Sequence, residues 1–152
     1  MTTPLLIEDL KRDEGCSLTA YPDPLSGGEP VTIGFGHVGP EVHDGLVWTS
    51  EQCETALQED AAKACRLLDA NIPWWRTQND VRQDAMANMT FNMGWGSGTS
   101  GLSGFHNFLN FMRTGQYDQA ATAMLDSRWA DQVHQRATRL ADMIRTGERP
   151  TP

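Results

Sequence analysis

Apolar residues recur at helical spacing along most of the chain, and the first such stretch covers residues 4–14. Thr3 followed by Pro4 is typical of a helix start, and Gly15 is typical of a helix end. Similar patterns, each bounded by capping residues, prolines or glycines, predict further helices over residues 49–70, 79–93, 103–115, 117–126 and 129–147. The sequence therefore predicts a mostly helical protein.

The pattern differs in residues 17–37. Two β-prone runs, LTAY (18–21) and VTIGFGH (31–37), flank the segment PDPLSGGEP. Glycine and proline exclude a long helix here, so the simplest prediction is a small antiparallel sheet with a loop.

These elements predict an α+β fold organised as one domain over residues 1–152. A small β lobe is expected at about 15–48, and a larger helical lobe at about 49–149, which also takes in the helix 4–14. A cleft between the two lobes is the natural place for a ligand.

The composition is that of a globular protein, with 39% hydrophobic and 21% charged residues and a formal net charge of −8. Such a chain is repelled by phosphate backbones, which argues against nucleic acid as a partner. Residues 128–152 nevertheless carry five Arg and three acidic residues. This local excess favours either an anionic ligand or, more commonly, a solvated helix face.

The three cysteines, Cys16, Cys53 and Cys65, are an odd number without metal-ligand spacing. We expect free thiols, no metal site and a chain made in a reducing compartment. The N-terminal residues lack the apolar core of a signal peptide, and no segment reaches the length of a membrane span. We therefore expect that the chain does not direct its own export by the general secretory route.

The candidate chemistry lies between residues 14 and 32. Glu14 falls on the last helical turn, where the helix dipole favours the protonated carboxyl that a general acid needs. Asp23 lies in a polar loop and is expected to stay ionised, and the Thr32 hydroxyl is suited to hold a water. Two carboxyls in unlike environments fit glycoside hydrolysis, although a solvated loop is the commoner explanation for such acids.

The stretch EGCSLTAYPDPLSGGEPVTIGFGH (14–37) resembles the phage-type lysozymes, the T-even phage lysozyme family or glycoside hydrolase family 24. Eight residues separate Glu14 from Asp23, as in that family, and TIGFGH fits the family motif at every position. The resemblance continues through VRQDAMANMTFNMG, SGFHNFL and DSRWADQVHQRATRLADMIRTG, so it covers nearly the whole chain in order. It implies a lysozyme-like fold.

The resemblance implies roles for individual residues. Glu14 would be the general acid, Asp23 the general base or charge stabiliser, and Thr32 the residue that positions water. The substrate-lining positions would be Val38, Phe91, Asn92 and Phe108. Both phenylalanines also fit helical core stripes, so binding and packing are equally open for them.

Three more residues would support the site, again by resemblance. Arg136 corresponds to a position that faces the catalytic Glu, and Asp60 to one that pairs with His37. We interpret the latter pair as a structural link between the lobes rather than a catalytic dyad. No metal or cofactor is implied.

Two features depart from the family pattern. Eight residues separate Asp23 from Thr32, against about five in the family, and the insertion brings in a rival carboxylate, Glu29. Because the Glu14-to-Asp23 spacing is intact, we favour Asp23 as the second catalytic carboxylate and interpret Glu29 as a solvated loop residue. Because the net charge is acidic, contact with an anionic cell wall would depend on the Arg-bearing C-terminal segment. The same charge argues against unaided attack on whole bacteria.

The resemblance implies an endolysin, a muramidase that hydrolyses the β-1,4 bond between N-acetylmuramic acid and N-acetylglucosamine in peptidoglycan with inversion. We expect a monomer made in the cytoplasm of the host bacterium, which reaches the cell wall with the help of a holin-type membrane permeabiliser. The alternatives are a lytic transglycosylase, which needs the acid but no water-activating base, and an inactive wall-binding module.

Overall fold

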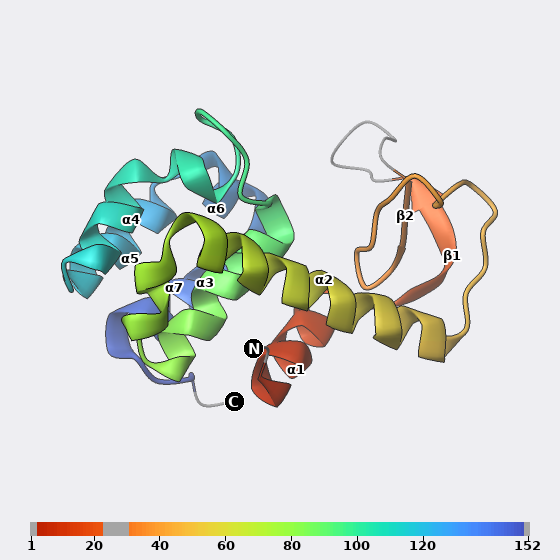
Figure 1. The fold of residues 1–152 in the computed structure, drawn as a ribbon, viewed down its shortest axis with the longest axis horizontal. Helices are drawn as coiled ribbons and strands as arrows, with labels where there is room; N and C mark the ends of the chain where they lie inside the picture. Colours follow the sequence, from red (N-terminus) through yellow and green to blue (C-terminus); the bar gives the residue numbers. More distant parts are fainter. Residues whose placement is uncertain (1–2, 23–30, 151–152) are drawn as a thin grey trace. The chain divides into compact units, whose positions relative to one another are not determined.

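The computed structural model describes residues 3–22 and 31–150 and has the predicted α+β fold, in which one helix precedes a two-stranded antiparallel sheet and further helices follow it (Figure 1). The chain divides into two compact units, residues 1–63 and 64–152. The first helix and the larger part of the second therefore belong with the sheet. In the division predicted from the sequence, both helices belong to the helical lobe.

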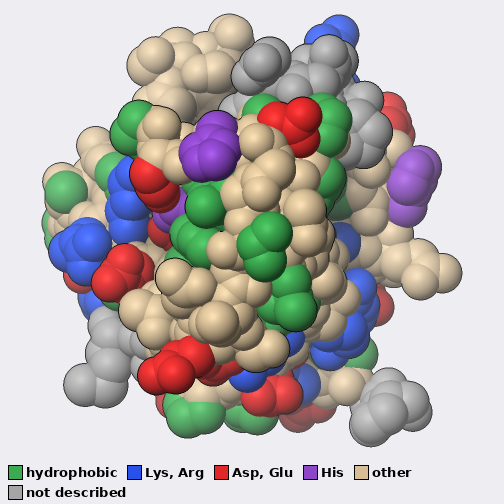
Figure 2. All heavy atoms as spheres, turned by 90° about the vertical axis from the view of Figure 1, so that its right-hand side faces the viewer, with side chains coloured by type: hydrophobic (Ala, Val, Ile, Leu, Met, Phe, Trp, Pro, Cys, Tyr) green, Lys and Arg blue, Asp and Glu red, His purple; other side chains and the backbone are tan. Residues whose placement is uncertain are grey.

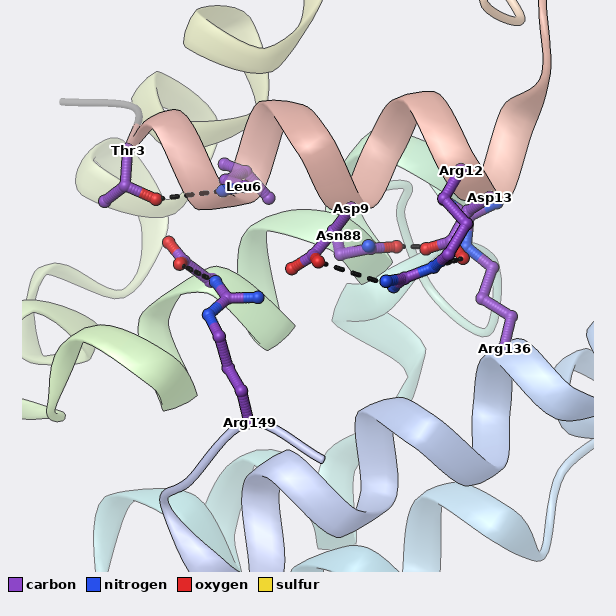
Figure 3. Close-up of polar contacts among 9 residues, drawn as sticks. Thr3, Leu6, Asp9, Arg12, Asp13, Asn88, Arg136 and Arg149 are labelled. Carbon is purple, nitrogen blue, oxygen red and sulfur yellow. Dashed lines mark hydrogen bonds and ion pairs between the residues drawn. The ribbon is translucent and has the colours of Figure 1, made fainter. Parts of the chain in front are cut away.

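Helix α1 (Pro4–Glu14) begins and ends where the sequence predicts. The Oγ1 of Thr3 accepts a hydrogen bond from the backbone N–H of Leu6 at 3.0 Å (Figure 3), and Gly15 ends the helix with a φ of 63°. The buried face is formed by Leu6, Ile7 and Leu10. On another face Lys11 forms an ion pair of 2.8 Å with Glu54 of the second helix.

Strands β1 (Ser17–Pro22) and β2 (Val31–Gly34) form the sheet, with Ser17 opposite Gly34 and Tyr21 opposite Thr32. The second strand is shorter than the predicted run to residue 37. Gly34 and Gly36 both adopt positive φ angles, and the chain turns back so that Ile33 and His37 exchange backbone hydrogen bonds of 2.9 and 2.8 Å. A glycine-based turn thus replaces the end of the expected strand.

Helix α2 (Ser50–Asn71) starts with the predicted capping box. The Thr49 Oγ1 accepts from the backbone N–H of Gln52 at 3.2 Å, and the Gln52 side chain accepts from the backbone N–H of Thr49 at 2.8 Å. A 3-10 turn, η2 (Pro73–Thr77), follows. Within residues 3–22 and 31–150, no helix combines the length and apolar character needed to cross a membrane.

The second unit is helical (Figure 1). Its elements are α3 (Asp80–Met93), η3 (Leu102–Gly104), α4 (His106–Arg113), α5 (Tyr117–Leu125), α6 (Arg128–Val133) and α7 (Gln135–Thr146). Helix α7 packs against α3, α5 and α6, and α4 packs against α5. Side chains of α3, α4 and α5 that are fully buried include Met86, Met89, Phe108, Met112 and Met124.

The single helix predicted over residues 129–147 is wrong in one respect, because it is broken at His134. This residue has a φ of 50° and separates α6 from α7. The sequence has no glycine or proline between residues 129 and 146 to mark the break. Tertiary packing accounts for it: Trp129 on α6 is buried and its Nε1 donates to the Oδ1 of Asn92 at 2.6 Å, which fixes α6 against α3.

Candidate functional site

Glu14, the last residue of α1, lies with its carboxyl against the backbone of Gly36. A Cβ atom built on Gly36 would stand 2.7 Å from Glu14 Oε2 and 3.2 Å from Glu14 Cδ. Gly36 also has a φ of 78°, which side-chain-bearing residues rarely adopt. The second glycine of the TIGFGH segment therefore provides the space in which the Glu14 carboxyl sits.

Thr32 lies in the same unit, in β2 opposite Tyr21. Among the residues that the structure describes, it is one of the few buried polar ones, with an exposed fraction of 6%. The sheet thus fixes the position of this threonine, while α1 and the glycine turn after β2 fix the position of Glu14.

Asp23 and Glu29, the two carboxylates between which the sequence left a choice, lie outside the described residues. They belong to the segment 23–30 that joins β1 to β2. The roles of both therefore stay predictions.

His37 follows the glycine turn and lies between two carboxylates. Its Nδ1 is 2.6 Å from the Oδ2 of Asp60, and its Nε2 is 2.7 Å from the Oε1 of Glu41. The Trp48 ring packs against the imidazole at a centroid distance of 5.4 Å, with the two ring planes tilted by 35°. Because each ring nitrogen faces an acceptor, the doubly protonated imidazolium satisfies this arrangement best.

The electrostatics of His37 follow from this geometry. Partial burial lowers the pKa of His37, but the hydrogen bonds to Glu41 and Asp60 outweigh that effect and raise the pKa above its ordinary value. The hydrogen bond from His37 in turn lowers the pKa of Glu41. The sequence predicted the pairing of His37 with Asp60 but missed Glu41, which lies in an irregular loop where spacing carries no signal.

The His37–Asp60 pair forms as expected. Both residues fall in the first unit, so the pair connects the turn after β2 to α2 within that unit. A pocket of about 400 Å³ opens beside it, lined by Trp48 and by Glu51 and Glu59 of α2 among others. Of the candidate catalytic residues, Glu14 and Thr32 lie in the described part of the chain, and neither lines this pocket.

The predicted substrate-lining residues differ in accessibility. Val38 of the first unit is 46% exposed. On the face drawn in Figure 2, exposed apolar side chains are interspersed with acidic ones. In the second unit Phe91 is half-buried and Asn92 is exposed. Phe108 has an exposed fraction of only 1% and meets Phe105 edge-on at 6.3 Å, so packing is the role that the structure favours for it.

Arg136 is held within the second unit. It lies on the first turn of α7, has an exposed fraction of 7% and donates through Nε to the Oδ1 of Asn88 at 3.0 Å (Figure 3). This bond orients a guanidinium whose planar fork is suited to carboxylates. The expected contact of Arg136 with Glu14 stays a prediction.

Comparison with known proteins gives two findings. The family model described as phage lysozyme matches residues 11–144. The pre-baseplate central spike protein Gp5 of Enterobacteria phage T4 is 33% identical over 167 aligned positions, and the match covers 93% of this chain. The chain spans only 28% of the length of that relative.

Proposed function

The chain belongs to the phage lysozyme family, and on that premise we propose that it hydrolyses the β-1,4 bond between N-acetylmuramic acid and N-acetylglucosamine in peptidoglycan. Family membership makes the protein a glycosidase of the lysozyme type. One observation carries the proposal furthest: the carboxyl of Glu14 is seated against Gly36 in the TIGFGH segment. An acid whose position is fixed in this way is already placed to protonate a glycosidic oxygen.

In the proposed mechanism Glu14 protonates the leaving oxygen of the glycosidic bond. Asp23 acts as general base on a water that the Thr32 hydroxyl positions, and the water attacks the opposite face of the sugar ring. This route inverts the configuration and requires the two carboxyls to stand about 6.5–9.5 Å apart. Glu29 is the alternative base, because the longer loop carries both acids.

Three matched substitutions test these roles on purified peptidoglycan: Glu14→Gln, Asp23→Asn and Glu29→Gln. Each keeps the size of the side chain and removes its charge. We expect the first two to lower the rate of release of reducing ends by roughly 100-fold or more, and the third to leave it within about threefold. The reverse result for Asp23 and Glu29 would transfer the base role to Glu29, and an unchanged Glu14→Gln enzyme would exclude the mechanism.

The products separate hydrolysis from its rivals. A lytic transglycosylase leaves 1,6-anhydro ends, whereas a hydrolase leaves free reducing ends, and mass spectrometry of the muropeptides distinguishes the two. The anomer formed first, observed by NMR, reports inversion or retention. A protein that binds sedimented cell walls without releasing any fragment would instead be an inactive wall-binding module.

The proposed substrate contacts are those of Val38, Phe91 and Asn92. In addition, the proposal includes Arg136 as the residue that holds Glu14 in place, supported by the hydrogen bond that orients its guanidinium.

Arg136→Lys keeps the charge but removes the planar guanidinium, so it is expected to lower kcat more than it raises KM. As a control, the circular dichroism spectrum of the variant should match that of the wild type.

In its biological setting we propose an endolysin, a monomer made in the host cytoplasm that reaches the wall after a holin-type protein permeabilises the membrane. Expression in a bacterial host with and without a holin tests this step. Lysis is expected only with the holin, and prompt lysis without it would exclude the requirement.

A second setting is favoured by the similarity to a central spike protein. In it the same lytic domain is carried on the virion and opens the wall at infection. Mass spectrometry of purified virions decides between the two settings, because an endolysin stays in the lysate and a spike component copurifies with the particle. The glycosidase chemistry proposed above is the same in both.

A further inference from the structure

Two of the three cysteines lie together in the first unit, although 36 residues separate them in the sequence. Cys16 directly precedes β1 and is exposed, while Cys53 lies on the first turn of α2 and has an exposed fraction of 0%. Both lie next to Gly34, which pairs with Ser17 across the sheet and would place a Cβ 3.4 Å from the Sγ of Cys53. One thiol of the pair is therefore open to solvent and the other is not.

The packing around Gly34 explains why the two lie close together. Gly34 is paired with Ser17, the residue that follows Cys16, so the sheet brings Cys16 to this point. A Cβ built on Gly34 would be 3.4 Å from the Sγ of Cys53 and equally close to the Trp48 ring. The Sγ of Cys53 therefore lies at the edge of the sheet, close to the strand position that follows Cys16.

We propose that Cys16 and Cys53 form a dithiol site which a low-molecular-weight disulfide oxidises to an intramolecular disulfide. In the first step the Cys16 thiolate attacks one sulfur of the oxidant, whose S–S bond breaks and releases one thiol. In the second step Cys53 loses its proton and attacks the Cys16 sulfur, releasing the second thiol. Two electrons and two protons pass from the protein to the oxidant, which becomes two thiols.

The order of the two steps follows from exposure. Only Cys16 is open to an oxidant from solvent, so the mixed disulfide forms there. Burial and then the interaction with Cys16 raise the pKa of Cys53 to about 11, which makes closure the slower step. Cys65 is a second buried thiol in the same chain and serves as an internal reference.

The disulfide would connect the segment just after Glu14 to the start of α2. It would close a long loop of the unfolded chain, so the oxidised protein is expected to have a Tm higher by roughly 5–10 °C. The proposal does not depend on the glycosidase assignment, since it concerns thiol chemistry that is measured without any substrate.

The experiment uses the full-length protein, purified reduced and then equilibrated in buffers of reduced and oxidised glutathione. We expect the mass to fall by about 2 Da and a peptide containing the Cys16–Cys53 link to appear, with Cys65 still reactive after denaturation. Cys16→Ser and Cys53→Ala should abolish this change, and Cys65→Ala should not. Three thiols that persist in the wild type, a lasting glutathione adduct on Cys16, or a Cys16-linked dimer would each overturn the proposal.

Discussion

The carboxyl of Glu14 and the Cα of Gly36 are in such close contact that no side chain fits between them, since a Cβ on Gly36 would stand 2.7 Å from Glu14 Oε2. Glu14 ends a helix and Gly36 belongs to a turn after a strand. The contact therefore couples the position of the proposed acid to the conformation of the TIGFGH segment, and it can be broken by adding one methyl group.

Gly36→Ala is expected to lower the rate of peptidoglycan cleavage by roughly 10- to 100-fold, because the new Cβ displaces the Glu14 carboxyl. The positive φ adds a strain of about 1–2 kcal/mol to the folded state. Turbidity loss of a cell-wall suspension gives the rate, and urea denaturation gives the free energy of unfolding.

Gly45→Ala is the matched control. Gly45 has a φ of 88°, but a Cβ built there has no atom within 4 Å. The two variants should lose similar stability, while only Gly36→Ala should lose activity. Equal losses of activity in both would show that backbone strain alone is responsible and that the Glu14 contact is irrelevant.

The pH dependence of stability is expected to depend on His37. Its folded pKa is raised above the unfolded value of about 6.5, so the imidazolium stabilises the folded state fully below that pH. This stabilisation is lost as the pH rises through the raised folded pKa. Asp60→Asn should therefore lower Tm at pH 5–6 by an amount that corresponds to about 1–2 kcal/mol, and should matter much less at pH 9.

Glu41→Gln provides the comparison for that experiment. It removes the second carboxylate on the same imidazole, but Glu41 is solvent-exposed, so the loss should be smaller than for Asp60→Asn. NMR titration of the His37 ring should give a lower pKa in both variants. A difference in Tm that is independent of pH would show that the two carboxylates act through packing and not through charge.

The sequence predicted those features that local chemistry determines. The capping box of Thr49 and Gln52 placed the start of α2 correctly, because its hydrogen bonds join neighbouring residues. The sequence did not predict that Glu41 binds His37 or that Cys16 and Cys53 both lie next to Gly34, since these arrangements depend on how loops and helices pack. The family motif supplied the proposed catalytic residues, which spacing alone could not distinguish from solvated acids.

The end of α7 is expected to depend on Arg82 of α3. The guanidinium donates to the carbonyls of Ile144 at 2.7 Å and Arg145 at 3.2 Å, and its Cζ lies 3.5 Å from the centroid of the Tyr117 ring. Arg82→Lys keeps the charge but not the planar fork, so it should lower the free energy of unfolding by about 1–2 kcal/mol.

Urea denaturation measures this change, with Arg113→Lys as the control. Arg113 is an exposed arginine in the last turn of α4, so its replacement should change stability by less than about 0.5 kcal/mol. Equal effects at both sites would mean that the contacts of Arg82 with α7 contribute nothing beyond the charge.

Replacement of His134, the residue that separates α6 from α7, by glycine is expected to stabilise the folded protein. It is exposed and has a φ of 50° and a ψ of −111°, a conformation that costs about 1–3 kcal/mol for a residue with a side chain. His134→Gly is therefore expected to raise the free energy of unfolding by roughly 0.5–1 kcal/mol. His106→Gly, at the exposed first position of α4, relieves no positive φ and should not raise the free energy of unfolding. A loss of stability in both variants would contradict strain at His134.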